Sequence, residues 1–154
     1  MIDTPRITQT AAQLTASLHL VVPRPDIRNV MGPGLSEVRA AITAHDIVAA
    51  GPWFTHHLRV DPDVFDFEIC IPVATPFTTT GRVEAGRWPP TTVARTYFHG
   101  DYEGLGAAWS EFDSWVANKG YTPRPDLWER YVIGPESGSD SSSWRTELNR
   151  PLVD

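Results

Sequence analysis

Two segments of the sequence alternate between apolar and polar residues so regularly that each must form a strand with two different faces. In Val64–Val73 four residues share the apolar face: Phe65, Phe67, Ile69 and Ile71. In Ser143–Val153 the corresponding face carries Trp144, Thr146 and Leu148. Each segment places a glutamate on the opposite face, Glu68 or Glu147, and a proline four residues later. The two glutamates lie about half of the 154-residue chain apart, which indicates a duplicated unit.

The rest of the chain repeats one order of elements. The first half predicts strand, helix, strand, strand over Thr10–Val22, Leu35–His45, Trp53–Val60 and Val64–Val73. The second half predicts the same order over Thr91–His99, Gly104–Lys119, Leu127–Ile133 and Ser143–Val153, with a short additional strand at Arg82–Trp88. We therefore expect one α+β domain over residues 1–154, with β-α-β-β halves at about 6–75 and 80–154.

The sequence marks the ends of the two predicted helices in different ways. Gly104–Lys119 has a continuous apolar stripe and ends at Gly120, which is typical of a helix C-terminus. The first helix is expected to begin near Pro33, because proline is tolerated in the first turn of a helix. A long loop, Pro23–Pro33, would then connect strand to helix, and a second loop, Gly134–Ser143, is expected before the last strand.

Charge and cysteine content exclude several classes of protein. The net charge is −6 and Lys119 is the only lysine, which argues against nucleic acid or an anionic membrane as partner. A single cysteine, Cys70, and the absence of a signal-peptide pattern predict a cytoplasmic protein. His56 and His57 point to opposite faces of a strand, and no other histidine spacing fits a metal site, so neither metal nor cofactor is expected.

Two motifs resemble a known family. The first is R-W-P-P-T-T-V-A-R-T-Y-F-H-G-D-Y-E-G-L, followed by a helix that ends at Gly120, and the second is W-R-T-E-L-N-R-P-L near the C-terminus. Together they resemble the GyrI-like (gyrase-inhibitor-like) small-molecule-binding domain, which is also the effector-binding half of AraC- and MerR-type regulators. The resemblance covers nearly the whole chain. The β-α-β-β units leave no segment for a helix-turn-helix, so a complete regulator is not expected.

The resemblance implies two β-α-β-β repeats related by a pseudo-twofold axis, with outer helices and a central ligand cleft. Members bind bulky, often aromatic and cationic compounds through a buried glutamate, and Glu147 is the position that matches. Some similar stand-alone proteins hydrolyse cyclopropane-bearing DNA-alkylating natural products. Either activity would serve resistance to a drug or toxin.

Candidate site residues follow from the strand faces. Both glutamates are expected to face the cleft or solvent, because the apolar faces must pack against the helices. An aromatic wall beside a carboxylate is suited to a delocalised cation. The predicted ligand-binding residues are Glu147, Glu68, Trp53, Trp88, Tyr97, Tyr131 and Trp144. If the protein is an enzyme, the predicted catalytic residues are Glu147 or Glu68 as general base and Tyr97 or Tyr131 as proton donor.

Three functions remain open from the sequence. The first is a stand-alone protein that binds or sequesters bulky hydrophobic or cationic compounds. The second is a hydrolase that opens a strained electrophilic ring. The third is an inhibitor or co-regulator whose acidic surface contacts another protein.

Overall fold

The computed structural model describes residues 2–135, 138 and 140–153, and the chain forms two compact units. Unit 1 comprises residues 1–10 and 91–154, and unit 2 comprises residues 11–90. Part of the loop predicted at Gly134–Ser143 (residues 136, 137 and 139) lies outside the described residues.

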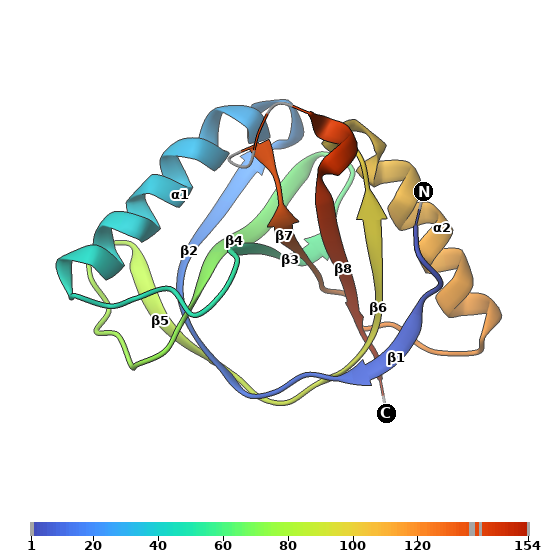
Figure 1. Ribbon diagram of the computed structural model, residues 1–154, viewed down its shortest axis with the longest axis horizontal. Coiled ribbons are helices and arrows are strands. Elements are labelled where there is room, and N and C mark those ends of the chain that lie inside the picture. The colour runs from blue at the N-terminus through green and yellow to red at the C-terminus, as the bar shows by residue number, and fades with distance from the viewer. Residues whose placement is uncertain (1, 136–137, 139, 154) are drawn as a thin grey trace. The chain divides into compact units, whose positions relative to one another are not determined.

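Unit 2 is an antiparallel sheet with one helix against it (Figure 1). Its strands are β2 (Gln13–Pro23), β3 (Phe54–Val60), β4 (Val64–Val73) and β5 (Val83–Trp88), in the order β3-β4-β2-β5. A short 3-10 turn, η1 (Arg24–Asp26), leads into the helix α1 (Ile27–Ala44). The apolar face of β4 packs under α1, and Phe67 and Ile69 are fully buried there.

Unit 1 contains the same kinds of element, four antiparallel strands and one α-helix. Its strands are β1 (Arg6–Gln9), β6 (Thr92–His99), β7 (Leu127–Ile133) and β8 (Arg145–Pro151), in the order β7-β8-β6-β1. The helix α2 (Leu105–Asn118) follows η2 (Tyr102–Gly104), and η4 (Ser141–Ser143) precedes β8. Phe112 of α2 packs with Phe98 of β6 and Leu148 of β8 in the core of this unit.

The two strand orders correspond position by position, which confirms the predicted duplication and the α+β class. One detail differs from the predicted halves. The edge strand β1 precedes β2 along the chain but pairs with β6, and β5 precedes β6 but pairs with β2. Each unit therefore takes its edge strand from the segment that leads into the other unit. Local sequence patterns carry no information about this exchange, because they do not specify a strand's partner.

The first helix begins earlier than the sequence predicts. α1 starts at Ile27, so Pro33 lies inside the helix and removes one backbone hydrogen bond. The additional turns are stabilised by packing, since Ile27, Val30 and Met31 lie against the core of unit 2. The segment predicted as a loop is therefore largely helical. Its apolar residues extend the helical stripe across the proline.

No helix among the described residues is long and apolar enough to cross a membrane.

Candidate functional site

Glu147 lies in the middle of β8, on the sheet face opposite α2. Its antiparallel partners are Tyr97 on β6 and Arg130 on β7, so the side chains of all three share that face. Arg95 and Asn149 lie one pair further along on the same face. The sheet thus brings Glu147 and Tyr97 together, as expected if both serve one site.

A network of donors surrounds the Glu147 carboxylate, which is only 7% exposed. The Tyr97 hydroxyl donates to Oε2 at 3.0 Å, and Asn149 Nδ2 donates to Oε1 at 3.0 Å. Two guanidinium groups approach the same Oε1, Arg95 at 3.4 Å and Arg130 at 3.5 Å. Burial of a carboxylate is costly unless it is paired, and these groups provide the pairing.

Tyr97 has a raised pKa for three reasons. Burial disfavours the phenolate, the charge of Glu147 repels it, and the hydrogen bond to Glu147 holds the proton. The guanidinium of Arg145 lies over the Tyr97 ring, 4.0 Å from the ring centroid. Tyr97 is therefore a protonated donor at neutral pH, stacked against a cation.

Glu68 occupies the equivalent strand position in unit 2, but its surroundings differ. His56 Nδ1 lies 2.9 Å from Glu68 Oε1, and the two residues are antiparallel partners on β3 and β4. The His56 ring contacts Trp88 edge-on at 4.7 Å, and Trp88 also contacts Phe54 at 5.1 Å. The structure thus places Glu68 and Trp88 on either side of one histidine. Sequence reasoning considered this histidine only as a metal ligand.

Tyr131 lies on the other face of the unit 1 sheet, and Trp144 precedes β8. Tyr131 pairs with Thr146, so it is on the α2 side and not beside Glu147. Its ring contacts Tyr102 at 5.6 Å, and Tyr102 in turn contacts Trp144 at 5.1 Å. Trp53, the remaining candidate, packs against the core cluster of unit 2.

The α2 side also holds a carboxylate that sequence reasoning missed. Glu129 Oε1 accepts a hydrogen bond from the Tyr131 hydroxyl at 2.8 Å, and Oε2 accepts one from Trp109 Nε1 at 2.6 Å. Both donors are neutral, and among the described residues no ion pair to Glu129 is found. We name Glu129 with Trp109, Tyr131, Tyr102 and Trp144 the Glu129 cluster. The sequence holds one indication of this cluster. Glu129 and Tyr131 are two residues apart on a predicted strand, so their side chains share one face of the sheet.

The match to a known family extends over nearly the whole chain. The model of the family described as "GyrI-like small molecule binding domain" matches residues 4–152. The chain belongs to this family. The resemblance drawn from the two sequence motifs is thereby confirmed. No curated protein sequence matches the chain significantly.

Solved structures share this GyrI-like fold. The C-terminal domain of EcmrR superposes with a TM-score of 0.87 at 20% identity, covering 98% of each chain. The chain spans 57% of the longer EcmrR chain solved in a complex with DNA (TM-score 0.84, 20% identity, 98% of this chain). SAV2435 bound to tetraphenylphosphonium gives 0.66 at 10% identity, covering 98% of this chain and 94% of that one. A hydrolase from Listeria innocua gives 0.61 at 10% identity, with 97% and 91% covered. At these identities the likeness concerns the fold alone.

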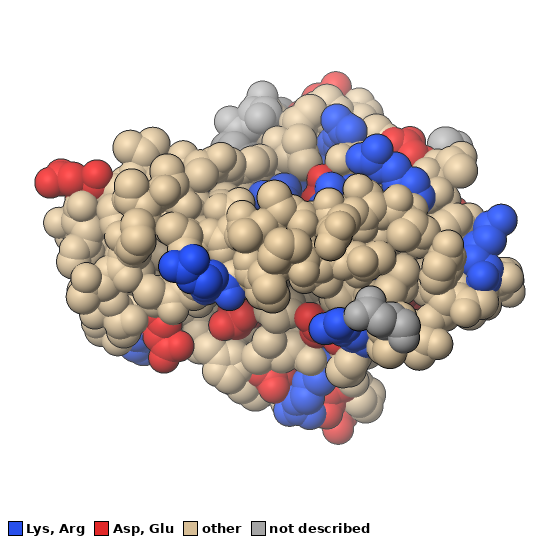
Figure 2. All heavy atoms as spheres, turned by 90° about the horizontal axis from the view of Figure 1, so that it is seen from below, with Lys and Arg blue, Asp and Glu red and all other residues tan. Residues whose placement is uncertain are grey.

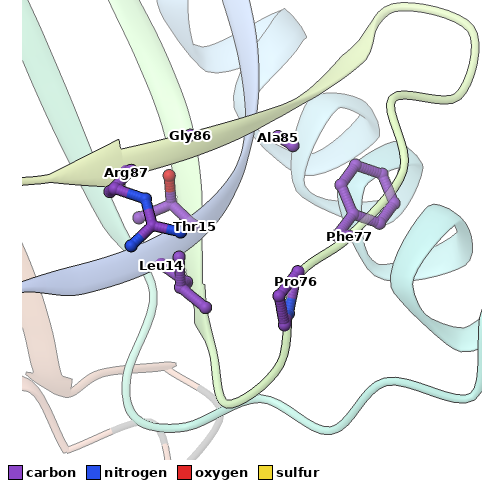
Figure 3. A pocket seen from close by; sticks show the side chains of 7 residues that line it. All are labelled: Leu14, Thr15, Pro76, Phe77, Ala85, Gly86 and Arg87. Atoms are coloured by element: carbon purple, nitrogen blue, oxygen red, sulfur yellow. The ribbon is translucent and has the colours of Figure 1, made fainter.

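The GyrI-like chain also has a cavity of about 190 Å³ within unit 2 (Figure 3). It is lined by Leu14, Thr15, Pro76, Phe77, Ala85, Gly86 and Arg87, and none of these is a predicted site residue. Gly86 is required locally, because a Cβ there would lie 2.5 Å from Thr15 Oγ1. The cavity lies between the paired strands β2 and β5 and the segment after β4 that carries Pro76 and Phe77.

The surface charge of the GyrI-like chain is mixed. On the face in Figure 2, acidic and basic side chains are interspersed and most of the surface is uncharged. Among the described residues drawn on this face, no continuous acidic patch is visible. Within the described part of the chain, no three His, Cys, Asp or Glu side chains converge to hold a metal ion.

Proposed function

We propose that this GyrI-like chain is a ligand-binding domain over residues 1–154 that binds and sequesters a bulky aromatic cation at the Glu129 cluster. The observation that carries the proposal is the pairing of Glu129 with neutral donors only, Trp109 and Tyr131. The charge of a carboxylate held by neutral donors is not balanced by those donors and can attract a cationic ligand, whereas the charge of one held by arginines is already balanced. The family description, small-molecule binding, supports the same activity.

The aromatic side chains around Glu129 suit a delocalised cation. Tyr131, Tyr102 and Trp144 form a continuous chain of ring contacts, and Trp109 lies on the opposite side of the carboxylate. Aromatic faces attract cations electrostatically, and their area favours a large apolar ligand. Tyr102, Trp109 and Trp144 are partly exposed, so a ligand can reach the cluster from solvent.

Glu147, the glutamate that the sequence favoured, is less suited to a cation. Arg95 and Arg130 already lie within 3.5 Å of its Oε1 atom. A cationic ligand would have to displace a guanidinium or lie beside one. Coulomb repulsion between two such charges near a protein surface is several kcal/mol, on the order of 4 kcal/mol at 4 Å.

The test uses tetraphenylphosphonium, the compound bound by the structural neighbour SAV2435. Its binding is followed by quenching of tryptophan fluorescence. Glu129→Gln keeps the shape of the side chain and removes its charge, and we expect affinity to fall roughly ten- to a hundredfold. Glu103→Gln is the matched control, because Glu103 is an exposed acid of η2 in the same unit. Equal affinity in the parent and Glu129→Gln would remove the cluster from the binding site.

Hydrolysis is a second candidate, favoured by the Tyr97–Glu147 hydrogen bond of 3.0 Å. A protonated phenol beside a carboxylate can serve as donor and base, as opening an activated ring by water requires. It ranks below binding because Arg95 and Arg130 already lie within 3.5 Å of Glu147 Oε1, where a base would have to accept a proton. A strained-ring alkylator incubated with a trace of protein separates the two. Hydrolysis requires many equivalents of ring-opened product per protein, whereas one equivalent or less contradicts it.

A further inference from the structure

We propose that the cavity of unit 2 binds a small hydrophobic monocarboxylate, about the size of benzoate, and that Arg87 recognises its charge. The observation is a cationic side chain on the wall of a cavity whose other side chains are almost all apolar (Figure 3). The cavity belongs to unit 2, whereas the Glu129 cluster belongs to unit 1. The proposal therefore does not rest on cation binding at that cluster.

The strand register places Arg87 beside the apolar wall. Leu14 of β2 is the antiparallel partner of Arg87 on β5, and Ala85 lies two residues before Arg87. Leu14 packs against the core of unit 2, so these three side chains lie on the α1 side of the sheet. Pro76 and Phe77, from the segment after β4, stand across the cavity from Arg87 and Leu14 (Figure 3).

The size of the cavity limits the ligand to about one ring. Small residues, Ala85 and Gly86, occupy the middle of β5, where larger side chains would fill the space. The volume of about 190 Å³ is somewhat larger than the roughly 150 Å³ of an apolar cavity that binds benzene. A six-membered ring with one carboxyl group therefore fits, whereas tetraphenylphosphonium, with four such rings, is too large.

Arg87 supplies a positive charge that no acid of this region balances. Within the part of the chain that the structure describes, its side chain makes no ion pair and no hydrogen bond. Glu84 alternates to the other face of β5, and Glu37 of α1 is paired with Arg82 at 2.7 Å. A guanidinium has five N–H donors in a planar fork, and two of them match the two oxygens of a carboxylate.

The apolar wall is held in place before a ligand binds. The Phe77 ring is buried and contacts His45, the residue that follows α1, edge-on with centroids 5.3 Å apart. His45 Nε2 lies 2.7 Å from Thr80 Oγ1. Thr79 Oγ1 accepts a hydrogen bond from the backbone N–H of Ala85 at 3.2 Å. The segment after β4 is thus tied to both α1 and β5, and binding to a preformed wall loses little free energy to ordering the protein.

The class of ligand follows from combining these walls. Pro76, Ala85 and Arg87 are exposed, so a ligand reaches the cavity from solvent. Leu14 and Phe77 offer apolar surface, which favours a hydrocarbon group, while Arg87 favours an anion. A neutral hydrocarbon would leave the guanidinium unused, and a small inorganic anion would leave the apolar wall unused. A hydrophobic carboxylate uses both.

The experiment titrates the full isotope-labelled chain with benzoate at constant ionic strength and follows the amide shifts by NMR. We expect saturating shifts in β5 and in residues 74–80, with a Kd on the order of 1 mM. Benzamide, the neutral isostere, should bind roughly three- to tenfold more weakly, because it lacks the charge that Arg87 recognises. Acetate lacks the ring and should give no saturating shifts at these residues.

Two variants separate the charge from the apolar wall. Arg87→Gln should weaken benzoate roughly three- to tenfold and leave benzamide unchanged. Arg39→Gln is its matched control, because it removes an exposed arginine of α1 in the same unit. Ala85→Leu fills the cavity from an exposed position and should abolish binding of both compounds. Ala40→Leu, at an exposed alanine of α1, is the control for the added bulk.

Three results would overturn the proposal: no saturable shifts with benzoate, shifts confined to unit 1, or equal benzoate affinity in the parent and Arg87→Gln. Equal binding of acetate and benzoate would also overturn it, since the apolar wall would then contribute nothing. A circular dichroism melt of each variant confirms that it is folded. Glu129→Gln should bind benzoate as the parent does, so failure of cation binding at the Glu129 cluster and failure of this proposal are separate results.

Discussion

Tyr97 connects the charged groups of unit 1 at the scale of single residues. Its hydroxyl donates to Glu147, and its ring supports Arg145. Burial and the anionic neighbour Glu147 both disfavour the phenolate, which raises the Tyr97 pKa above the ordinary 10.0. A group whose pKa is higher in the folded state contributes stability below its unfolded pKa. That contribution disappears as the pH rises through the folded pKa.

Tyr97→Phe should therefore destabilise the protein in a pH-dependent way. At neutral pH the lost hydrogen bond to a carboxylate should cost about 1–2 kcal/mol. Above about pH 10 the difference between parent and variant should shrink, because the phenol ionises first in the unfolded parent, whereas the folded parent still holds its proton. Urea unfolding from pH 7 to 11 measures this difference, with Tyr121→Phe, at an exposed tyrosine, as control. A difference that stays constant up to pH 11 would contradict the pKa assignment.

At the scale of elements, the position of α1 depends on one glycine. Gly34 is buried against the sheet, and a Cβ at this position would lie 2.5 Å from Ile69 Cδ1. Ile69 is fully buried on β4, so it has little room to move. Gly34 therefore lets the helix approach the strand closely.

Gly34→Ala should destabilise unit 2 by about 1–3 kcal/mol, because the added methyl group overpacks the helix–sheet contact. Gly106→Ala provides a comparison in α2. Apart from its own helix and chain neighbours, a Cβ at Gly106 would meet nothing within 4 Å, so alanine there should stabilise by up to about 1 kcal/mol through helix propensity. The midpoints of urea denaturation should thus move in opposite directions. Shifts of the same sign would show that propensity, and not the contact with Ile69, governs this position.

At the scale of the whole molecule, each unit depends on a strand that precedes the other unit's first long strand. β1 pairs with β6 over four residues, from Arg6↔Arg95 to Gln9↔Thr92. Thr10 and Thr91 continue the pairing, with Thr10 N donating to Thr91 O at 2.8 Å. In the same way, β5 pairs with β2 at the edge of the unit 2 strands. The sheet of unit 1 therefore needs strands from both the N-terminal and the C-terminal part of the sequence.

A chain that lacks residues 1–9 should lose protection selectively. The β6 segment that pairs with β1 becomes an edge, so amide hydrogen exchange there should accelerate. The amides of β2 that pair with β4 belong to unit 2 and should exchange as in the full chain. Exchange measured by mass spectrometry over the two strands gives an internal comparison. Equal protection of β6 in both chains would mean that the β1 pairing adds no local stability.

The sequence by itself determined the elements whose signal is local. Val64–Val73 has its predicted bounds because alternation and the flanking turn residues specify a strand without reference to its partners. α2 lies within one residue of its prediction, since a full apolar stripe and Gly120 define it. The duplication was visible because both halves repeat these local patterns. The face of Glu147 followed from alternation alone.

Only the tertiary structure decided which side chains meet. Arg95, Arg130 and Tyr97 come from other strands, and the register that places them around Glu147 is set by long-range pairing. The same pairing places Tyr131 on the face opposite Glu147, beside Glu129 of its own strand. A one-residue change of register would send every one of these side chains to the opposite face. The charge of the site is therefore a property of strand pairing, which the residues of any one strand do not encode.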